Sequence, residues 1–321
     1  MEKDQPTETK FKLGQYVVLY FDLMGVRQSL FNGIDYHSSE VSEDKQKEID
    51  RTSDTILGFL NGIQELHDMF KENASGLYDL FMKDASEYAT PNHKEEFLRQ
   101  AERISVGIQQ GSDTTLLYIR DDCEAAQMII TEWMVFLPLY IIAAMSKGVL
   151  VRGCLARGTA WEIRKDCLFG PVIHEAAQIE KCEAKYPRII ATPQYCKMCA
   201  DTMARLNISK PLPTNPINPF KMLSQDYDEK MIFDYLGPIA LAGLNEIFVR
   251  KGYGLKSLEA LVNGARDYVQ YSCVRYKSDE KLSDIYQKLC AYFDERLKPY
   301  IVTERVAVRC DEKFRIKDGG C

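Results

Sequence analysis

Two aspartates in this sequence occupy positions from which carboxylates can hold a divalent metal ion. Asp22 closes an apolar run over residues 16–22 shortly before Gly25, and Asp113 lies in a Gln-Gly-Ser-Asp turn between two predicted strands. If those strands pair side by side, the aspartates converge, and carboxylate oxygens shared with phosphates are what Mg²⁺ and Mn²⁺ prefer. Taken singly, Asp22 also suits a helix cap and Asp113 a turn. Together they predict phosphate chemistry.

One cysteine pair, Cys196 and Cys199, has the spacing of a metal or redox motif. A structural zinc site needs four ligands, which a second cysteine or histidine doublet usually completes. The chain has no such doublet, and its four histidines lie apart at His37, His67, His93 and His174. A thioredoxin-like pair would open a helix after the first strand, whereas this one comes late. We therefore expect reduced cysteines in a packed core.

The rest of the pattern predicts the elements that position the aspartates. The run over 16–22 is typical of a buried central strand. We expect further strands at 104–109 and 114–119, which form a hairpin, at 149–152 and 154–163, which form a second pair, and at 188–191. We expect helices at 49–71, 124–147 and 169–185. This order matches an α+β, ferredoxin-like sheet whose helices cover one face.

The domain organisation follows from changes along the chain. Residues 1–205 form the predicted catalytic domain, with a surface insertion at about 71–100. Four prolines between 211 and 219 mark a loop or linker. Residues 206–321 hold two further helical patterns, at 257–272 and 279–298, and have no motif of their own. We interpret this segment as a helical C-terminal extension packed on the core.

Composition excludes several classes of protein. The chain has 321 residues, of which 45% are hydrophobic and 27% charged, so it is neither disordered nor collagenous. Its net charge of −6 gives no basic surface for long nucleic acid. The most apolar run, residues 133–145, is too short to span a bilayer, and residues 1–12 lack a secretory signal pattern. We expect a cytoplasmic protein with no membrane partner.

Four segments, taken in order, resemble the class III nucleotidyl cyclases. The family's first metal motif is similar to Phe21-Asp22-Leu23-Met24-Gly25, and its second metal motif is similar to residues 111–117. The strand over 151–158, which ends in glycine, and the helix over 169–180 are similar to the family's later motifs. The resemblance covers residues 14–195. Each motif alone is short, but the four follow the family's order.

The resemblance implies a two-metal site. In the family, two Mg²⁺ or Mn²⁺ ions bind both aspartates and the backbone carbonyl after the first, which correspond to Asp22, Asp113 and Leu23. The substrate phosphates would then be bound around Phe21, Met24, Gly25, Val26 and Arg27, at the start of a helix. The reaction is attack of the ribose 3′-hydroxyl on the α-phosphorus, which expels pyrophosphate and yields a 3′,5′-cyclic nucleotide.

The chain departs from the family at four site positions. The lysine and aspartate that read a purine are replaced by Gln109 and Cys167, so the purine edge would lack its partners. The asparagine and arginine that orient the ribose and stabilise the transition state are replaced by His174 and Gln178. An arginine from elsewhere would have to supply the missing charge. Three are candidates: Arg152, Arg157 and Arg188.

The chain keeps the metal aspartates and lacks the purine readers, and in this it resembles the bacterial pyrimidine cyclases of the Pycsar antiphage system. That resemblance implies conversion of UTP or CTP to cyclic UMP or cyclic CMP, with a separate effector that senses the product. Class III sites form between two domains, so it also implies a homodimer.

Two other functions stay open. One is a degenerate cyclase-like module that binds a nucleotide and regulates a partner. The other is a different nucleotidyl enzyme on a similar fold, such as a diguanylate cyclase, although the Gly-Gly-Asp/Glu-Glu-Phe motif of that class is absent.

Overall fold

Eight strands form one sheet in the part of the chain that the structure describes. The computed structural model describes residues 13–24, 42–82, 90–111, 114–205, 219–250, 252 and 255–301. Seven strands follow the order β2-β3-β1-β4-β6-β8-β7, and β5 pairs with β4. Their bounds are β1 Gly14–Met24, β2 Gly107–Gln110, β3 Thr114–Arg120, β4 Leu150–Arg164, β5 Cys167–Phe169, β6 Ile189–Ala191, β7 Leu223–Gln225 and β8 Met231–Phe233.

The first four strands have the ferredoxin-like arrangement. β1 lies between β3 and β4 and is antiparallel to both, and β2 is antiparallel to β3. This order follows from two helical crossovers, which each connect a strand to the next but one. β1 pairs with β4 over its whole length, from Gly14 opposite Ala160 to Met24 opposite Leu150. The structure therefore confirms the predicted α+β fold and the central place of β1.

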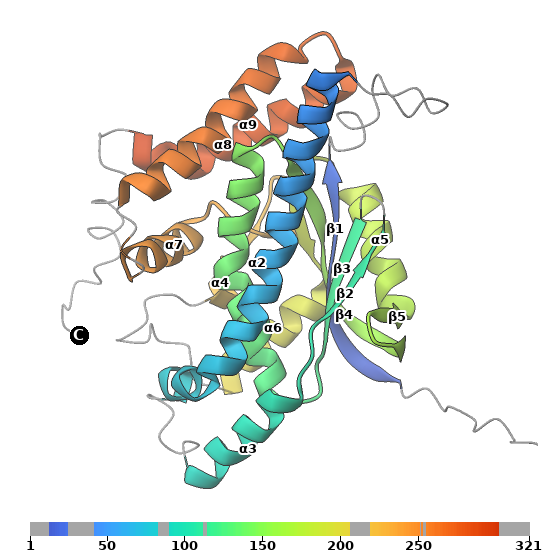
Figure 1. Cartoon of the computed structure of the whole chain (residues 1–321), viewed down its shortest axis with the longest axis vertical. Coiled ribbons are helices and arrows are strands. Elements are labelled where there is room, and N and C mark those ends of the chain that lie inside the picture. The colour runs from blue at the N-terminus through green and yellow to red at the C-terminus, as the bar shows by residue number, and fades with distance from the viewer. Residues whose placement is uncertain are drawn as a thin grey trace, which may run out of the picture.

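Helices lie on both faces of the sheet, not on one as expected (Figure 1). α4 and α2 lie on one side and α5 on the other, because β1 is apolar on both of its alternating faces. The helices are α2 Glu43–Met82, α3 Pro91–Arg103, α4 Glu124–Ser146, α5 Pro171–Glu183, α6 Pro193–Arg205, α7 Pro238–Arg250, α8 Leu255–Arg275 and α9 Glu280–Ile301, with a 3₁₀ turn η1 at Pro219–Met222.

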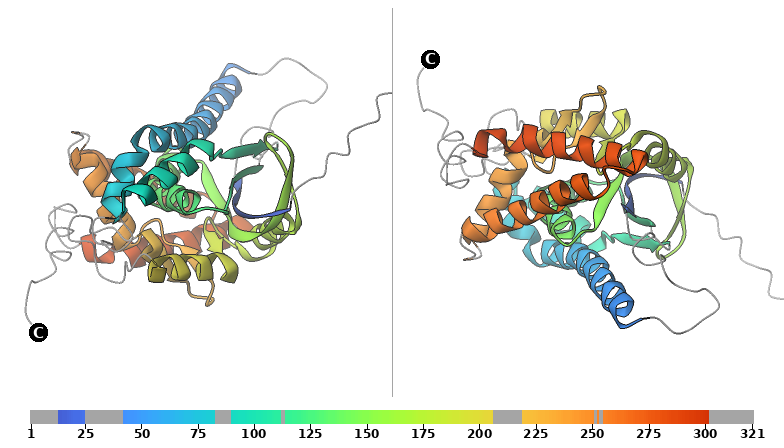
Figure 2. Two further views of the ribbon diagram at one scale, coloured as in Figure 1. Left: turned by 90° about the horizontal axis from the view of Figure 1, so that it is seen from below. Right: turned by 90° about the horizontal axis from the view of Figure 1, so that it is seen from above.

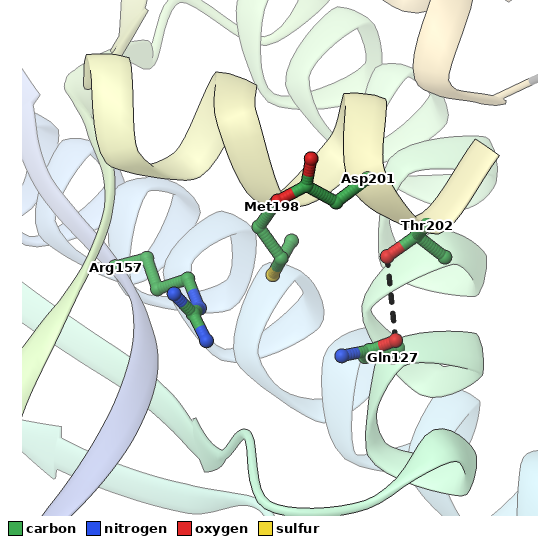
Figure 3. A pocket seen from close by; sticks show the side chains of 5 residues that line it. All are labelled: Gln127, Arg157, Met198, Asp201 and Thr202. Carbon is green, nitrogen blue, oxygen red and sulfur yellow. Dashed lines mark hydrogen bonds between the residues drawn. The ribbon is translucent and has the colours of Figure 1, made fainter. Parts of the chain in front are cut away.

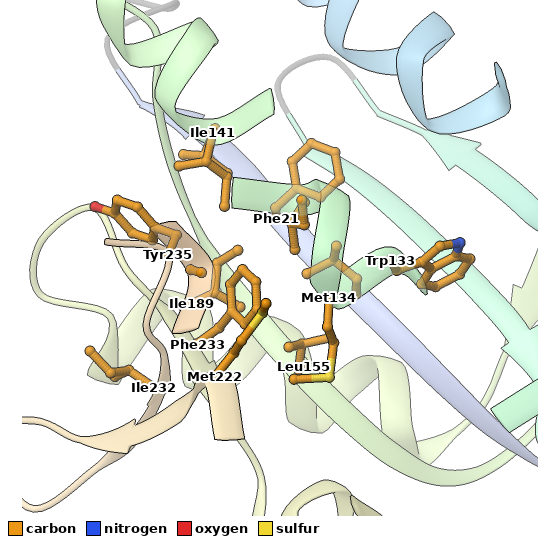
Figure 4. Packing of buried hydrophobic residues seen from close by; sticks show 14 of the residues in the cluster. Phe21, Trp133, Met134, Ile141, Leu155, Ile189, Met222, Ile232, Phe233 and Tyr235 are labelled. Carbon is orange, nitrogen blue, oxygen red and sulfur yellow. The ribbon is translucent and has the colours of Figure 1, made fainter. Parts of the chain in front are cut away.

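The larger core surrounds α4. In it, Phe21 from β1 and Met134 from α4 pack with residues of β6 and β8, such as Ile189 and Phe233 (Figure 4). Among the described helices, α4 is the one long and apolar enough to cross a membrane, but most of its apolar residues are buried inside the protein. A helix that is apolar all round is expected in a core. The prediction of a buried helix over 133–145 is confirmed.

Three sequence-based expectations need correction. The first helix does not end at residue 71, since α2 continues to Met82. Residues 149–163 are not two strands, since β4 is continuous and its hairpin partner is β5. The extension is not only helical, since β7 and β8 add to the sheet next to β6 and α7 follows them. Whether residues 71–100 are an insertion relative to a family stays a prediction, but Tyr78 and Phe97 are buried in the core.

The C-terminal helices cover the α4 side of the molecule. α8 packs on α4, and α9 packs on α8 (Figures 1 and 2). Within the described residues of 206–321, β8 pairs with β6 through Ile190 and Ile232. The extension is therefore packed on the sheet both by strand pairing and by helix packing.

Gly153 allows β4 to approach β1 closely. A Cβ at this position would lie 2.3 Å from the backbone oxygen of Tyr20, which cannot move without disturbing the central strand. We expect Gly153→Ala to lower the free energy of unfolding by about 1–3 kcal/mol. Gly76 is exposed on α2 with open space around it, so Gly76→Ala should raise stability by roughly 0.5–1 kcal/mol. Urea unfolding of both variants tests this, and a Gly153→Ala protein as stable as the wild type would contradict the close packing.

Candidate functional site

Asp22 lies near the end of β1, on the face of the sheet that α5 covers. Side chains alternate along a strand, and Tyr16 and Val18 belong to the buried cluster beneath α5, so Asp22 points to that face as well. Its side chain is 17% exposed. Thr114 on β3 stands opposite it on one side. Asp113 precedes Thr114 in the sequence and lies outside the described residues, so the convergence of the two aspartates stays a prediction.

Arg152 joins Asp22 to a second carboxylate. It stands opposite Asp22 on β4, and its Nη2 atom donates to Oδ2 of Asp22 at 3.2 Å. Its Nε atom donates to Oε1 of Glu180, which projects from α5 and is 7% exposed. One guanidinium therefore bridges two largely buried carboxylates, and the three groups together carry one formal negative charge. Such a cluster of partly buried charges is stable only because each charge is paired.

The donors around Asp22 suit a hard divalent cation. Asp22 contributes carboxylate oxygens and Leu23 a backbone carbonyl, and Mg²⁺ and Mn²⁺ are bound by oxygen donors of these kinds. Among the described residues no three His, Cys, Asp or Glu side chains gather closely enough to hold a metal ion. Asp113, the expected second metal ligand, lies outside the described residues, so the ligand set predicted for this metal is not tested.

Gln109 and Cys167, the positions of the family's purine readers, are brought together. Oε1 of Gln109 accepts a hydrogen bond from the backbone N–H of Leu168, at 3.0 Å. A second hydrogen bond connects the same two segments, since the backbone N–H of Ile108 donates to Oδ1 of Asp166 at 3.0 Å. Since its oxygen is engaged, Gln109 can offer the two hydrogens of its amide nitrogen to a ligand.

His174 and Gln178 lie on the outer surface of α5. They are four residues apart and therefore share a helix face, and both are exposed. The opposite face of α5, with Val172, Ala176 and Glu180, packs on the sheet. The structure thus does not bring His174 and Gln178 to Asp22 within one chain.

The residues expected to bind phosphates are only partly described. The side chain of Phe21 is fully buried in the larger core, so it can meet a phosphate only through its backbone (Figure 4). Met24 is half-buried and packs against the same core. Gly25, Val26 and Arg27 lie outside the described residues, so the turn that they were predicted to form is not tested.

Of the three arginines considered for the missing charge, Arg152 is the one beside Asp22. Arg157 points to the α4 face of the sheet, where its Nε atom donates to the buried Asp121 at 2.5 Å. Arg188 is 1% exposed and pairs with Asp226 and Asp228.

A pocket of about 160 Å³ lies next to Arg157, lined also by Gln127, Met198, Asp201 and Thr202 (Figure 3). It lies between α4 and α6 on the face of the sheet opposite Asp22. It is therefore separate from the candidate site.

Glu180 was not predicted from the sequence, although a signal was present. It follows Val172 and Ala176 at intervals of four residues, which places it on the buried face of α5. An acidic residue in such a position is rarely buried without a cationic partner. The pattern therefore indicated a buried ion pair, but the sequence did not show that the partner is Arg152.

Comparison with protein-family models and with curated proteins finds no match for this chain.

Proposed function

We propose that this chain is a metal-dependent pyrimidine nucleotide cyclase, which converts UTP or CTP to cyclic UMP or cyclic CMP and pyrophosphate. The observation that carries the proposal is the position of Asp22 in a ferredoxin-like sheet. Asp22 lies near the end of the central strand β1. Directly opposite it is Thr114, the first residue of β3, which follows Asp113 in the sequence. The order of the four motifs along the chain supports the same activity.

The chain's own residues have distinct parts in this reaction. Asp22 and Asp113, with the carbonyl of Leu23, would hold two Mg²⁺ or Mn²⁺ ions, which lower the pKa of the ribose 3′-hydroxyl and neutralise the triphosphate. Arg152 places a positive charge beside Asp22 and, with Glu180, fixes its orientation. Charge that develops at the α-phosphate is stabilised by such preorganised cations. We therefore propose that Arg152 supplies the positive charge that the family's transition-state arginine provides, since the neutral Gln178 cannot supply it.

The proposal of a pyrimidine base rests on Gln109 and Cys167, which replace the family's purine-reading lysine and aspartate. The side-chain oxygen of Gln109 is bound to the backbone of β5, so its amide nitrogen is directed to donate. Uracil and cytosine both carry a ring carbonyl that accepts such a bond, whereas the family's purine-reading lysine and aspartate are absent. Guanine carries a carbonyl of the same kind, so the Gln109 contact alone does not select a pyrimidine, and the choice rests on the loss of the two purine readers. Neither feature distinguishes UTP from CTP.

We propose that the active form is a homodimer. His174 and Gln178 are exposed on α5, away from Asp22 of their own chain, so they would act on the partner's site. Ile163 and Phe169, at the nearby end of the β4–β5 hairpin, are 44% and 47% exposed and suit an apolar contact with a second copy. Specific activity should fall on dilution, together with the dimer fraction in sedimentation. Constant activity per chain where monomers predominate would exclude a shared site.

The same proposal places the protein in the cytoplasm, where its product is sensed by a separate effector in antiphage defence. The support is the resemblance to the Pycsar cyclases. Expression with and without phage infection, followed by nucleotide extraction, tests it. A cyclic pyrimidine nucleotide that does not rise on infection would contradict the defence role and leave the catalytic proposal in place.

The direct test is incubation of the purified chain with each of ATP, GTP, CTP and UTP and Mn²⁺, followed by mass spectrometry. Cyclic UMP or cyclic CMP as the sole product is expected. Cyclic AMP would show that Gln109 and Cys167 do not set the base. No product from any of the four would favour the second candidate function below.

Removal of the Arg152 charge should reduce catalysis. We expect Arg152→Gln to lower kcat by roughly 10²–10³-fold, the scale of one lost electrostatic donor, and Arg152→Lys to recover part of it. Arg99→Gln is the matched control, because Arg99 is 57% exposed on α3, outside the site around Asp22 and the proposed dimer contact. Thermal unfolding separates a catalytic loss from misfolding. An Arg152→Gln protein with unchanged kcat would show that Arg152 only stabilises the sheet.

The Arg152 bridge also favours a second function, a nucleotide-binding regulatory module. An arginine that already neutralises Asp22 competes with a metal ion, and His174 and Gln178 replace the family's transition-state groups. A regulatory module would bind a nucleotide and be stabilised against heat by it, with no turnover. Pyrophosphate release would exclude this function.

A further inference from the structure

Two cysteine sulfurs meet between the last two helices of the described chain. Cys273 lies on α8 and Cys290 on α9, and their Sγ atoms are 2.6 Å apart. The two helices are joined by residues 276–279 and pack against each other, as the right-hand view of Figure 2 shows. Both cysteines are half-buried, so a small oxidant can approach them.

We propose that Cys273 and Cys290 form a reversible disulfide that cross-links α8 to α9 when a peroxide oxidises the protein. A covalent S–S bond is about 2.05 Å long, so the two sulfurs need to approach by about 0.5 Å. In cytosolic proteins, disulfides of this kind are transient and sense the redox state. The proposal does not depend on the cyclase activity, because neither residue belongs to the site around Asp22.

The order of the two chemical steps follows from the surroundings of the thiols. The Cys290 thiol can donate its proton to the backbone carbonyl of Val269, 3.8 Å from its Sγ atom, and burial raises the pKa of Cys290, so this thiol keeps its proton at neutral pH. Cys273 therefore attacks first. Its thiolate bonds to one oxygen of hydrogen peroxide, the O–O bond breaks, and the leaving hydroxide takes up a proton to form water.

The second step closes the disulfide. The Cys290 sulfur attacks the sulfenic acid on Cys273, an S–S bond forms, and the S–O bond breaks. The hydroxide released takes up the Cys290 proton as a second water. Two thiols and one peroxide thus give one disulfide and two waters, with two electrons passing from sulfur to the peroxide.

The cross-link would hold the C-terminal helices against the sheet. α8 packs on α4, and on α9 the hydroxyl of Tyr292 donates to Oδ1 of Asp234 at 2.8 Å, just beyond β8. The disulfide would join positions 17 residues apart. Because it restricts the unfolded chain, we expect it to raise the thermal midpoint by roughly 4–5 °C.

The test treats the full chain with hydrogen peroxide and then alkylates the remaining thiols. A non-reducing digest analysed by mass spectrometry should contain one peptide pair that links Cys273 to Cys290 and is lost on reduction. Cys273→Ser and Cys290→Ser should each abolish this pair and the rise in thermal midpoint. Cys196→Ser is the matched control and should change neither, since Cys196 lies on α6.

Two outcomes would overturn the proposal. One is recovery of Cys273 and Cys290 as separate alkylated or sulfinic peptides after peroxide treatment. The other is a cross-link that survives in Cys273→Ser with the same yield, which would place the disulfide elsewhere. Circular dichroism of the serine variants before oxidation confirms that they are folded.

Discussion

The Asp22→Asn protein should fold like the wild type and lose at least ~10³-fold in metal-dependent nucleotide cyclisation, equivalent to about 4 kcal/mol of transition-state stabilisation. Asparagine keeps the shape of the side chain, and Arg152 retains its bond to Glu180, so the sheet should stay intact. The charge that would hold a divalent cation is lost. Steady-state turnover of UTP and CTP with Mn²⁺ measures the effect, and Asp113→Asn should give the same loss.

The matched control for this experiment is Asp122→Asn. Asp122 is 53% exposed and pairs with Arg120 at the far end of β3, away from Asp22. Its activity should lie within about two-fold of the wild type, since exposed ion pairs contribute little. If Asp22→Asn and Asp113→Asn both kept wild-type turnover, the two-metal assignment would fail, whatever the identity of the base.

The Arg188→Met protein should be destabilised by about 3–5 kcal/mol, the usual effect of removing one partner of a buried ion pair. Arg188 is 1% exposed, and its Nη2 atom donates to Oδ2 of Asp228 at 2.6 Å and to the carbonyl of Glu183 at 2.7 Å. Its Nη1 atom also donates to Asp226, which is 9% exposed and would be left as a buried carboxylate. Equilibrium urea unfolding measures the difference.

The pH dependence of this effect has a defined sign. Hydrogen bonding to Arg188 lowers the pKa of Asp228 in the folded protein below its unfolded value of about 3.9. Its contribution to stability is therefore present above that pH and is lost as the pH falls through the folded-state pKa. We expect the gap between wild type and Arg188→Met to be widest near pH 7 and to narrow below about pH 4.

The control for Arg188 is Lys230→Met. Lys230 belongs to the same region and pairs with Glu183, but it is 45% exposed, so its removal should cost at most about 1 kcal/mol. Arg188 lies just before β6, and its ion pairs with Asp226 and Asp228 connect this strand to the turn between β7 and β8. Loss of stability should therefore affect the C-terminal extension together with the sheet. Equal stability of the two methionine variants would show that the buried pair contributes little.

Much of the core could be predicted from the sequence. The apolar run that ends at Asp22 lies in β1, the Gly-Ser-Asp sequence falls between the strands β2 and β3, and the apolar pattern over 124–147 is α4. These segments are long or strongly patterned, so local periodicity indicates their type. β7 and β8 were not predicted, because a strand of three residues is too short to show a hydrophobic period. They are strands because β6 offers backbone partners to Ile232 and its neighbours.

Gly153 shows why one residue can be misinterpreted from sequence alone. A glycine between two apolar segments indicates a break in a strand, and for this reason the sequence predicts two strands within residues 149–163. In the structure it lies inside continuous β4, where the backbone of Tyr20 leaves no room for a side chain. A break in a strand and a close approach of two strands both favour glycine. Only the position of the neighbouring strand β1 distinguishes these two explanations.

The sequence by itself determined which chemical groups the chain carries, their order, and the strand that carries Asp22. The tertiary structure decided which of these groups meet. Arg152 reaches Asp22 because β1 and β4 pair in one register, and Glu180 reaches Arg152 because α5 packs on that face. Cys273 meets Cys290 in the same way, through the packing of α8 on α9. Contacts between residues distant in sequence depend on strand register and helix packing, which no local pattern encodes.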